Sequence, residues 1–325
     1  MKNRLLFPII FAFIFSSCSD FSGNEDAVEA SLKPAPVTKT TTPPSTTTKY
    51  DLDAITFGNN TFVAVGESGV VRTSSDNGAT WDKVTPGKNI QLNEIAYGNS
   101  TFVAVGKSGA HLYSTDNGAT WDNGTWSDSD WVTGVAFGNN TFIGVSSTYL
   151  TKSTDNGANW VRACSGVRVY DMAFGNNKFV GSGAEGAIQI SDNGSGCSTP
   201  SGSGSGTTEE TLYGITFGNN RFLTVGSDGW LSITSDNGNN FTPLTIPTGA
   251  SHLYSSAYGN NIFVTVGNKS VVVSNNDGSS NPILKENTLS FNDVTFGNGV
   301  FVAVGNKEII YTSTDGDTWT KVYPQ

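Results

Sequence analysis

The sequence predicts an all-β protein built from repeats, and three observations support this prediction. The phrase aromatic-Gly-Asn recurs at intervals of 37 to 43 residues, beginning at Phe57, Tyr97, Phe137, Phe174, Phe217, Tyr258 and Phe296. Between these points the chain forms short alternating or apolar runs bounded by Gly and Asn, a pattern typical of strands joined by tight turns. Residues 51–325 show no apolar spacing of the helical kind. A period near 40 of strand-like units predicts a seven-bladed β-propeller over residues 51–325.

The first repeat shows how one blade is expected to form. DAITF (53–57), TFVAVG (61–66), VVRTSS (70–75) and WDKVT (81–85) read as four successive strands. GNN, ESG and DNGAT separate them, and Asn and Gly tolerate the positive φ angles that tight turns require. Each repeat therefore predicts one four-stranded antiparallel blade, and seven repeats leave no room for a second domain.

Small and large residues alternate at fixed positions around the aromatic-Gly-Asn phrase. A small residue, Ala or Thr, precedes each aromatic, and a phenylalanine follows five residues later, at Phe62, Phe102, Phe142, Phe179, Phe222, Phe263 and Phe301. The inner strands of adjacent blades converge, so small and large groups must alternate to fill the taper. We interpret this ladder as core packing, and the sequence predicts no cofactor.

A second repeated phrase, Ser-x-Asp-x-Gly-x-Thr-Trp, occupies the third turn, as in TSSDNGATW (73–81) and YSTDNGATW (113–121). This phrase resembles the Asp-box (BNR repeat) of β-propellers that include sialidases, sortilin-type receptors and photosystem assembly factors. Units four, five and six replace the tryptophan with Cys197, Phe241 and Asn281. The other residues that carry the resemblance are Asp76, Gly78, Trp81, Asp116, Gly118, Trp121, Asp155, Gly157, Trp160, Asp192, Gly194, Asp236, Gly238, Asp277, Gly278, Asp315, Gly316 and Trp319.

The Asp-box residues have a structural interpretation. An aspartate side chain can accept hydrogen bonds from backbone amides of its own turn, and the tryptophan can bury a large ring between blades. Catalysis requires one site, whereas this phrase is repeated around the whole ring. In sialidases these turns lie on the face opposite the active site, so the resemblance implies that this face is structural and contains no catalytic residue.

The N-terminal segment resembles a bacterial lipoprotein signal. Lys2 and Arg4 precede an apolar run that is too short to span a membrane, and Ser16 and Ser17 precede Cys18. The resemblance implies a signal peptide at residues 1–17 and lipid attachment at Cys18, with an ordinary secretory signal as the alternative. Residues 18–50 are rich in Ser, Thr and Pro and predict a disordered tether. We expect a lipid-anchored protein of the cell envelope, on the outer membrane, with the side of the membrane left open.

Cysteine content and charge limit the chemistry further. Once Cys18 is set aside, Cys164 and Cys197 remain, and in an exported chain such a pair indicates either a disulfide or two buried thiols. The formal net charge of −10 disfavours a nucleic acid partner, since a phosphate backbone would be repelled. No histidine or cysteine spacing suits a transition metal, so no metal site is predicted.

The second turns and the blade-to-blade connections vary between repeats, and variable loops on a rigid scaffold are where binding residues usually lie. The candidate binding rim on this variable face consists of Glu67, Lys107, Trp126, Trp131, Tyr149, Glu185, Asp228, Trp230 and Tyr254. A sialidase needs three converging arginines, and the opening strand of the first blade has none. Other glycan hydrolases need a carboxylate pair, for which the candidates are Glu67, Asp128, Asp130, Glu185, Glu209, Glu210 and Asp228.

These observations favour a monomeric lipoprotein whose propeller is a non-catalytic binding or assembly scaffold for a protein or a glycan. The alternative is a glycan-active hydrolase that uses a carboxylate pair on the variable face.

Overall fold

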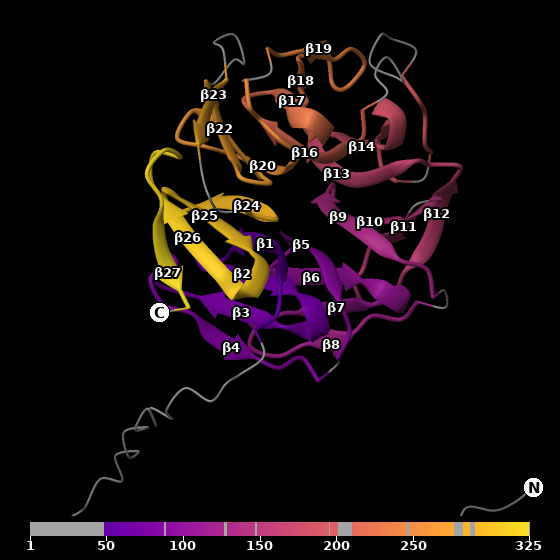
Figure 1. Cartoon of the computed structure of the whole chain (residues 1–325). Helices are drawn as coiled ribbons and strands as arrows, with labels where there is room; N and C mark the ends of the chain where they lie inside the picture. Colours follow the sequence, from indigo (N-terminus) through magenta and orange to yellow (C-terminus); the bar gives the residue numbers. More distant parts are fainter. Residues whose placement is uncertain are drawn as a thin grey trace, which may run out of the picture. The chain divides into compact units, whose positions relative to one another are not determined.

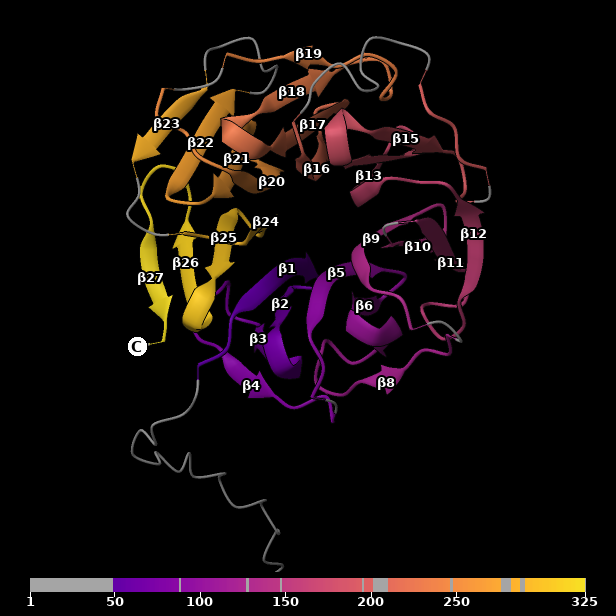
Figure 2. The ribbon, with the colours of Figure 1, turned by 45° about the vertical axis from the view of Figure 1, so that its right-hand side comes forward.

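Seven antiparallel sheets stand around a central channel, each as one blade of a β-propeller (Figure 1; Figure 2). The computed structural model describes residues 49–87, 89–126, 129–146, 148–194, 196–200, 210–245, 248–275, 282–286 and 290–324. Cys18, Asp128, Glu209, Asp277 and Gly278 lie outside the described residues. The predicted fold class, an all-β seven-bladed propeller with four-stranded antiparallel blades, is confirmed. No helix in the described part of the chain is long and apolar enough to cross a membrane.

Each blade is built from strands that are consecutive in sequence, and the first strand of each blade faces the channel. Blades 1 to 3 consist of β1 (Leu52–Gly58), β2 (Thr61–Gly66), β3 (Val71–Ser74), β4 (Asp82–Val84); β5 (Leu92–Gly98), β6 (Thr101–Gly106), β7 (His111–Ser114), β8 (Asp122–Asn123); and β9 (Val132–Gly138), β10 (Thr141–Ser146), β11 (Tyr149–Ser153), β12 (Val161–Ser165).

The remaining blades follow the same order, with one difference in blade 4. They consist of β13 (Val169–Gly175), β14 (Lys178–Gly183), β15 (Ile188–Ser191); β16 (Leu212–Gly218), β17 (Arg221–Gly226), β18 (Leu231–Thr234), β19 (Thr242–Pro243); β20 (Leu253–Gly259), β21 (Ile262–Gly267), β22 (Ser270–Asn275), β23 (Ile283–Glu286); and β24 (Asp293–Gly297), β25 (Val300–Gly305), β26 (Ile309–Ser313), β27 (Thr320–Tyr323). Blade 4 has three strands within the described residues, and a single bridge between Ile190 and Ser198 stands in place of the fourth.

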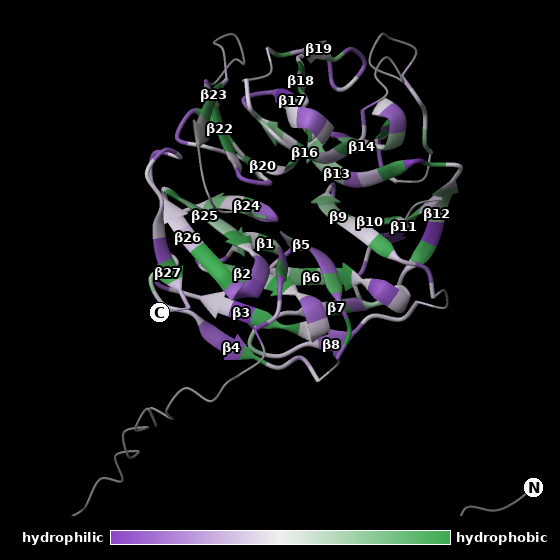
Figure 3. Cartoon of the chain, in the orientation of Figure 1, coloured by the Kyte–Doolittle hydropathy of each residue, from purple (hydrophilic) through white to green (hydrophobic). Residues whose placement is uncertain are grey.

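Five of the second turns are short 3-10 turns rather than simple hairpins. They are η1 (Glu67–Gly69), η2 (Lys107–Gly109), η3 (Ala184–Gly186), η4 (Ser227–Gly229) and η5 (Asn306–Glu308). Their central residues have positive φ angles, as at Ser68 (57°) and Asp228 (49°). Several of these turns are hydrophilic, whereas the strands that they connect contain hydrophobic residues (Figure 3).

The aromatic-Gly-Asn phrase holds the inner strands of neighbouring blades together. A Cβ atom on Gly58 would overlap the ring of Tyr97, so the aromatic residue of blade 2 lies directly over the glycine of blade 1. The same relation joins all successive blades, through the pairs Gly98 and Phe137, Gly138 and Phe174, Gly175 and Phe217, Gly218 and Tyr258, Gly259 and Phe296, and Gly297 and Phe57. Glycine is required here because the adjacent ring occupies the space that any side chain would need.

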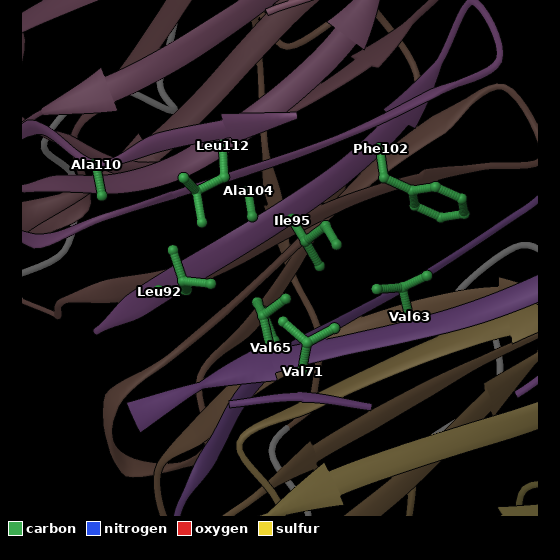
Figure 4. Close-up of a cluster of buried hydrophobic side chains, with 10 residues drawn as sticks. Val63, Val65, Val71, Leu92, Ile95, Phe102, Ala104, Ala110 and Leu112 are labelled. Carbon is green, nitrogen blue, oxygen red and sulfur yellow. The ribbon is translucent and has the colours of Figure 1, made fainter. Parts of the chain in front are cut away.

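The core consists of apolar layers between adjacent blades. Figure 4 shows one layer, where Val63 and Val65 of blade 1 face Leu92 and Ile95 of blade 2. The seven phenylalanines of the predicted ladder are no more than 1% exposed. Each layer is bounded by two sheets, which explains why the second strands are apolar on both faces.

The ring closes between blade 7 and blade 1 without strand exchange, because β24–β27 and β1–β4 form separate sheets. Side chains make this closure instead. Arg72 of β3 and Glu308 of η5 form a buried ion pair, and Glu308 Oε1 also accepts the Tyr50 amide at 3.3 Å. Asp293 of blade 7 accepts the backbone amide of Ile55 in blade 1 at 2.6 Å.

Candidate functional site

The first and third turns lie together on one face of the ring, the constant face, where asparagine side chains join neighbouring blades. Asn59 of the first turn in blade 1 donates to Asn117 of the third turn in blade 2, at 2.8 Å. Equivalent bonds join Asn99 to Asn156 at 3.2 Å and Asn176 to Asn237 at 2.9 Å. These turns therefore connect blades, and their amides are used in doing so.

Within the third turn of blade 1, the aspartate accepts hydrogen bonds from its own turn. Asp76 accepts from the Ser74 hydroxyl at 2.8 Å and from the Thr80 amide and hydroxyl at 2.9 and 2.6 Å. The Trp81 indole donates to the Gly78 carbonyl at 3.0 Å, which fixes the ring at the start of the fourth strand. The Thr80 hydroxyl bond in particular lowers the pKa of Asp76, so its carboxylate stays ionised at neutral pH.

Four more turns repeat this arrangement around Asp116, Asp155, Asp236 and Asp315. Blade 4 differs, because its Asp192 carboxylate pairs with Lys178, while the bond from the Gly194 amide to the Ser191 hydroxyl is kept, at 2.8 Å. Outside blade 4, each of these carboxylates accepts hydrogen bonds from its own turn. The geometry of these turns gives them a structural role.

The two remaining cysteines are joined in a disulfide that links β12 of blade 3 to the segment after β15 of blade 4. Their Cα atoms lie 6.2 Å apart. Cys197, at the position that tryptophan occupies in other blades, packs beside the apolar layer of Val167 and Val169. The covalent bond thus joins blade 3 to the outer segment of blade 4, the blade that lacks a regular fourth strand.

The candidate rim residues divide into exposed and packed side chains. Glu67, Trp131, Glu185 and Asp228 are exposed, and Lys107 and Tyr254 are half-exposed. Trp131 is 53% exposed, and the Lys107 ammonium group lies 4.5 Å from the centre of its ring. These side chains are open to a partner on the variable face.

Tyr149 is buried, and Trp126 and Trp230 are half-exposed but pack against neighbouring side chains. Tyr149 is 2% exposed and lies under the guanidinium group of Arg162, at 3.9 Å from its ring centre, so it belongs to the core. Trp126 packs on Tyr149 and on the buried His111, with ring centres 6.2 and 6.0 Å away. Trp230 packs against the apolar layer between blades 4 and 5. Their sequence positions beside variable turns did not reveal this packing.

The central channel contains a feature that was not predicted, a cavity of about 270 Å³ lined by three carboxylates. Glu94, Asp171 and Asp293 occupy the same position in blades 2, 4 and 7, three residues before the repeated aromatic. Glu94 and Asp171 keep part of their surface open to the channel, and Asp293 is 8% exposed. The inner strands enclose all three groups.

The two channel aspartates satisfy backbone amides that the sheets leave unpaired. Asp171 accepts from the Ile215 amide of the next blade at 2.9 Å and from the Met172 amide at 2.6 Å. Asp293 accepts from Ile55 of the next blade, as described above, and from Val294 at 2.7 Å. An inner strand is the edge of its sheet and exposes such amides to the channel. The carboxylates therefore cap strand edges.

Burial raises the pKa of each channel carboxyl group. The pKa of Asp171 rises to about 7 and that of Asp293 to about 6, because burial penalises the charged form. Glu94 has a pKa well above its usual range, through burial and then the nearby charges of Asp293 and Asp171. Asp53, closer to the variable face, has a pKa of about 6 for the same main reason.

Replacing Glu94 with glutamine is expected to stabilise the protein at pH 8 and to change little at pH 4. The folded pKa lies above the unfolded one, so the folded state holds more protons and wild-type stability is lost as pH rises above about 4.5. The difference in the free energy of unfolding between Glu94→Gln and the wild type should grow with pH to on the order of 1 kcal/mol or more. Urea unfolding at several pH values measures it.

The variant must be compared with the wild type at each pH, because His111 changes the stability with pH in the opposite direction. Burial lowers the pKa of His111 to about 4, so this residue favours the folded state more as pH rises toward 6.5. Asn123→Ala, at an exposed position without a titratable group, serves as the control and should give a difference that does not depend on pH. An advantage of Glu94→Gln that is equal at pH 4 and pH 8 would contradict the prediction.

No group of three or more His, Cys, Asp or Glu side chains is placed to hold a metal ion among the residues that the structure describes. Three of the candidate acids lie on different blades, Glu67 in η1, Glu185 in η3 and Asp228 in η4, whereas Glu210 accepts the hydroxyl of Ser227, the residue before Asp228. Glu185 pairs with Arg168 at 2.9 Å, and Asp228 lies 3.9 Å from His252. No facing carboxylate pair is formed by these three residues.

Sequence reasoning missed the channel acids because each stands alone in its own repeat. Alignment of the seven repeats on their aromatic residue gives Ala54, Glu94, Gly134, Asp171, Gly214, Ser255 and Asp293 at this position. The inner strands gather around one channel, so polar residues at one repeat position must meet. That rule could have identified the cluster from sequence alone.

The fold and these turns define a seven-bladed β-propeller with a constant face and a variable face. No protein-family model and no curated protein matches the sequence. Solved structures do match it in fold. YCF48 from Cyanidioschyzon merolae has a TM-score of 0.64 and 17% identity, over 81% of this chain and 95% of that chain.

Two further structures have the same TM-score of 0.64. They are YCF48 bound to D1 peptide, with 18% identity over 82% of this chain and 93% of the other, and the WD40 β-propeller domain of Doa1, with 19% identity over 81% and 92%. At these identities the likeness shows the propeller fold alone. The resemblance to Asp-box proteins thus rests on the turn sequences and on the turn geometry given above.

Proposed function

We propose that the protein is an exported lipoprotein whose propeller binds a protein partner as a non-catalytic scaffold. The observation that carries this proposal is the contrast between the two faces. The constant face uses its polar groups for bonds within and between blades, whereas the variable face leaves side chains such as Trp131 and Lys107 open. Exposed aromatic side chains are typical anchors of protein interfaces. One structure of similar fold holds a peptide, as its name states.

The membrane anchor is the second part of the proposal. The resemblance of residues 1–17 to a lipoprotein signal supports lipid attachment at Cys18 and a place on the outer membrane. Residues 18–50 would then act as a tether that lets the propeller reorient near the surface. Radiolabelled palmitate should enter the wild-type chain and not Cys18→Ala, and equal labelling of the two would refute attachment at this residue.

Crosslinking in intact cells tests the binding function. A photoreactive amino acid at Trp131, on the variable face, should capture one defined protein, while the same amino acid at Asn117, on the constant face, should capture none. Glycans are the competing class of ligand, and the full chain should neither bind nor cleave them on a glycan array. Release of reducing sugar that is lost in Asp228→Asn would replace the scaffold with the alternative, a glycan hydrolase.

A further inference from the structure

Three tyrosines occupy one repeat position in three successive blades and form what we name the tyrosine arc. Tyr170, Tyr213 and Tyr254 stand four residues before the repeated aromatic, on the inner strands β13, β16 and β20. The other four blades have Asp53, Asn93, Thr133 and Asn292 at this position. This repeat position is therefore aromatic in blades 4 to 6 and polar in the other four blades.

Each residue of the tyrosine arc is the extra residue of a β-bulge. The pairing of β13 with β14 shifts between Val169 and Asp171, so Tyr170 has no partner in the register. The same shift leaves Tyr213 and Tyr254 without register partners in blades 5 and 6. The same shift occurs at Asp53, Asn93 and Thr133 in blades 1 to 3, so the bulge belongs to the repeat and the arc differs from those blades in its side chains. All three rings remain half-exposed.

The rings of blades 5 and 6 form one cluster with negative charge around it. The Tyr213 ring centre lies 5.7 Å from that of Tyr254, edge to face, and 6.1 Å from that of His252. Burial raises the pKa of Tyr213, and so do the nearby Tyr254, Asp228, Tyr170 and Glu210. Asp228 also lies 3.9 Å from His252, and Glu210 accepts the hydroxyl of Ser227, the residue before Asp228, so two carboxylates border the cluster and favour a positively charged ligand.

Glycine allows the inner strands at the arc to approach closely. A Cβ atom on Gly214, the residue after Tyr213, would lie 2.5 Å from the Tyr254 carbonyl oxygen. A Cβ on Gly134 would lie 2.8 Å from the Tyr170 carbonyl oxygen, and the Thr133 hydroxyl donates to that oxygen at 2.8 Å. The arc therefore rests on strands that are fixed in place, which reduces the entropy cost of binding.

We propose that the tyrosine arc binds an arginine or lysine side chain on an extended segment of the protein partner; this rests on the proposed scaffold function. The cation stacks against the rings of the arc, beside the carboxylates of Asp228 and Glu210. Charge complementarity selects this occupant. An acidic segment would meet the same carboxylates as like charges, and a neutral sugar can donate hydroxyl hydrogen bonds to them but gains no charge attraction.

Binding of defined peptides to the full chain tests the arc by calorimetry. The probes are three acetylated and amidated peptides, Gly-Ser-X-Gly-X-Ser-Gly, in which X is arginine, glutamine or glutamate. The arginine peptide should bind most tightly and lose affinity as salt is added. Tyr213→Ala should weaken its binding roughly five-fold, the equivalent of about 1 kcal/mol for one cation–π contact, whereas Tyr213→Phe keeps the ring and should bind as the wild type does.

Thr242→Ala is the control, because Thr242 is exposed on β19, the outer strand of the blade that carries Tyr213, and lies outside both the arc and the candidate binding rim. It should leave the affinity for the arginine peptide unchanged. Tighter binding of the glutamine or glutamate peptide, no binding of the arginine peptide at millimolar concentration, or equal affinity of Tyr213→Ala and wild type would each overturn the arc as the site. The scaffold function is judged separately by crosslinking and by glycan release, so its failure is distinguishable from that of the arc.

Discussion

Replacing Glu308 with alanine is expected to lower the free energy of unfolding by about 3–5 kcal/mol. Arg72 and Glu308 are 3% and 5% exposed, so the substitution leaves a guanidinium group buried without its counter-charge. The remaining contacts of Arg72 are the Val71 carbonyl at 3.0 Å and the ring of Tyr323, whose centre is 5.5 Å away. Since this pair joins blade 1 to blade 7, its loss weakens the contact that closes the ring. Guanidinium unfolding measures the change.

Two further variants distinguish the cost of leaving a charge buried without a partner from the cost of losing an ion pair. Arg168 and Glu185 form the matched exposed pair, with side chains 60% and 68% exposed, and Glu185→Ala should cost less than about 1 kcal/mol. The double variant Arg72→Met, Glu308→Leu should recover most of the lost stability, because no charge is left buried. A loss for Glu308→Ala as small as that for Glu185→Ala would show that the pair does not hold the ring closed.

Replacing Gly98 with alanine is expected to cost more than about 2 kcal/mol. The added methyl group would overlap the Phe137 ring at the atoms nearest its backbone, which cannot move aside as a flexible side-chain end could. Phe137 is also held by Phe142, with ring centres 4.6 Å apart. The melting temperature and the chemical denaturation midpoint should both fall.

Gly196→Ala provides the control for this substitution. A Cβ atom at Gly196 would meet no atom within 4 Å, so the change should alter stability by less than about 0.5 kcal/mol. The variant Gly98→Ala combined with Phe137→Ala should regain part of what the first substitution loses, since the overlapping ring is gone. If Gly98→Ala were as stable as Gly196→Ala, the glycine would not be required by the neighbouring ring.

The fold could be predicted well because the same pattern of strands and turns occurs in every repeat of the sequence. Seven copies of aromatic-Gly-Asn allow the strand order and turn positions to be compared within one chain, so an irregular repeat does not hide the pattern. Boundaries were less certain where contacts between blades decide them. The predicted fourth strand of blade 1 began at Trp81, but the indole is held in the turn by its bond to Gly78 and β4 begins at Asp82.

The candidate site was predicted less well, because binding surfaces depend on which side chains neighbouring blades cover. Tyr149 and Trp131 both stand beside variable segments in the sequence, yet one is buried under Arg162 and the other is open. The channel carboxylates occupy one position of the repeat and the tyrosine arc occupies the position before it. The other blades have different types of residue at these two positions. Each departure looks incidental until the ring places these residues around one axis.

The closure between blade 7 and blade 1 has a consequence for the order of the chain. Since every blade is one continuous segment and no strand is shared across the junction, the ring has no seam in its backbone hydrogen bonds. Tyr50 and Tyr323 pack in the same apolar layer, which brings the two ends of the propeller together. A circular permutant that joins these ends and opens the connection near Gly87 would retain all seven sheets. The order of the blades around the axis is thus independent of the blade at which translation begins.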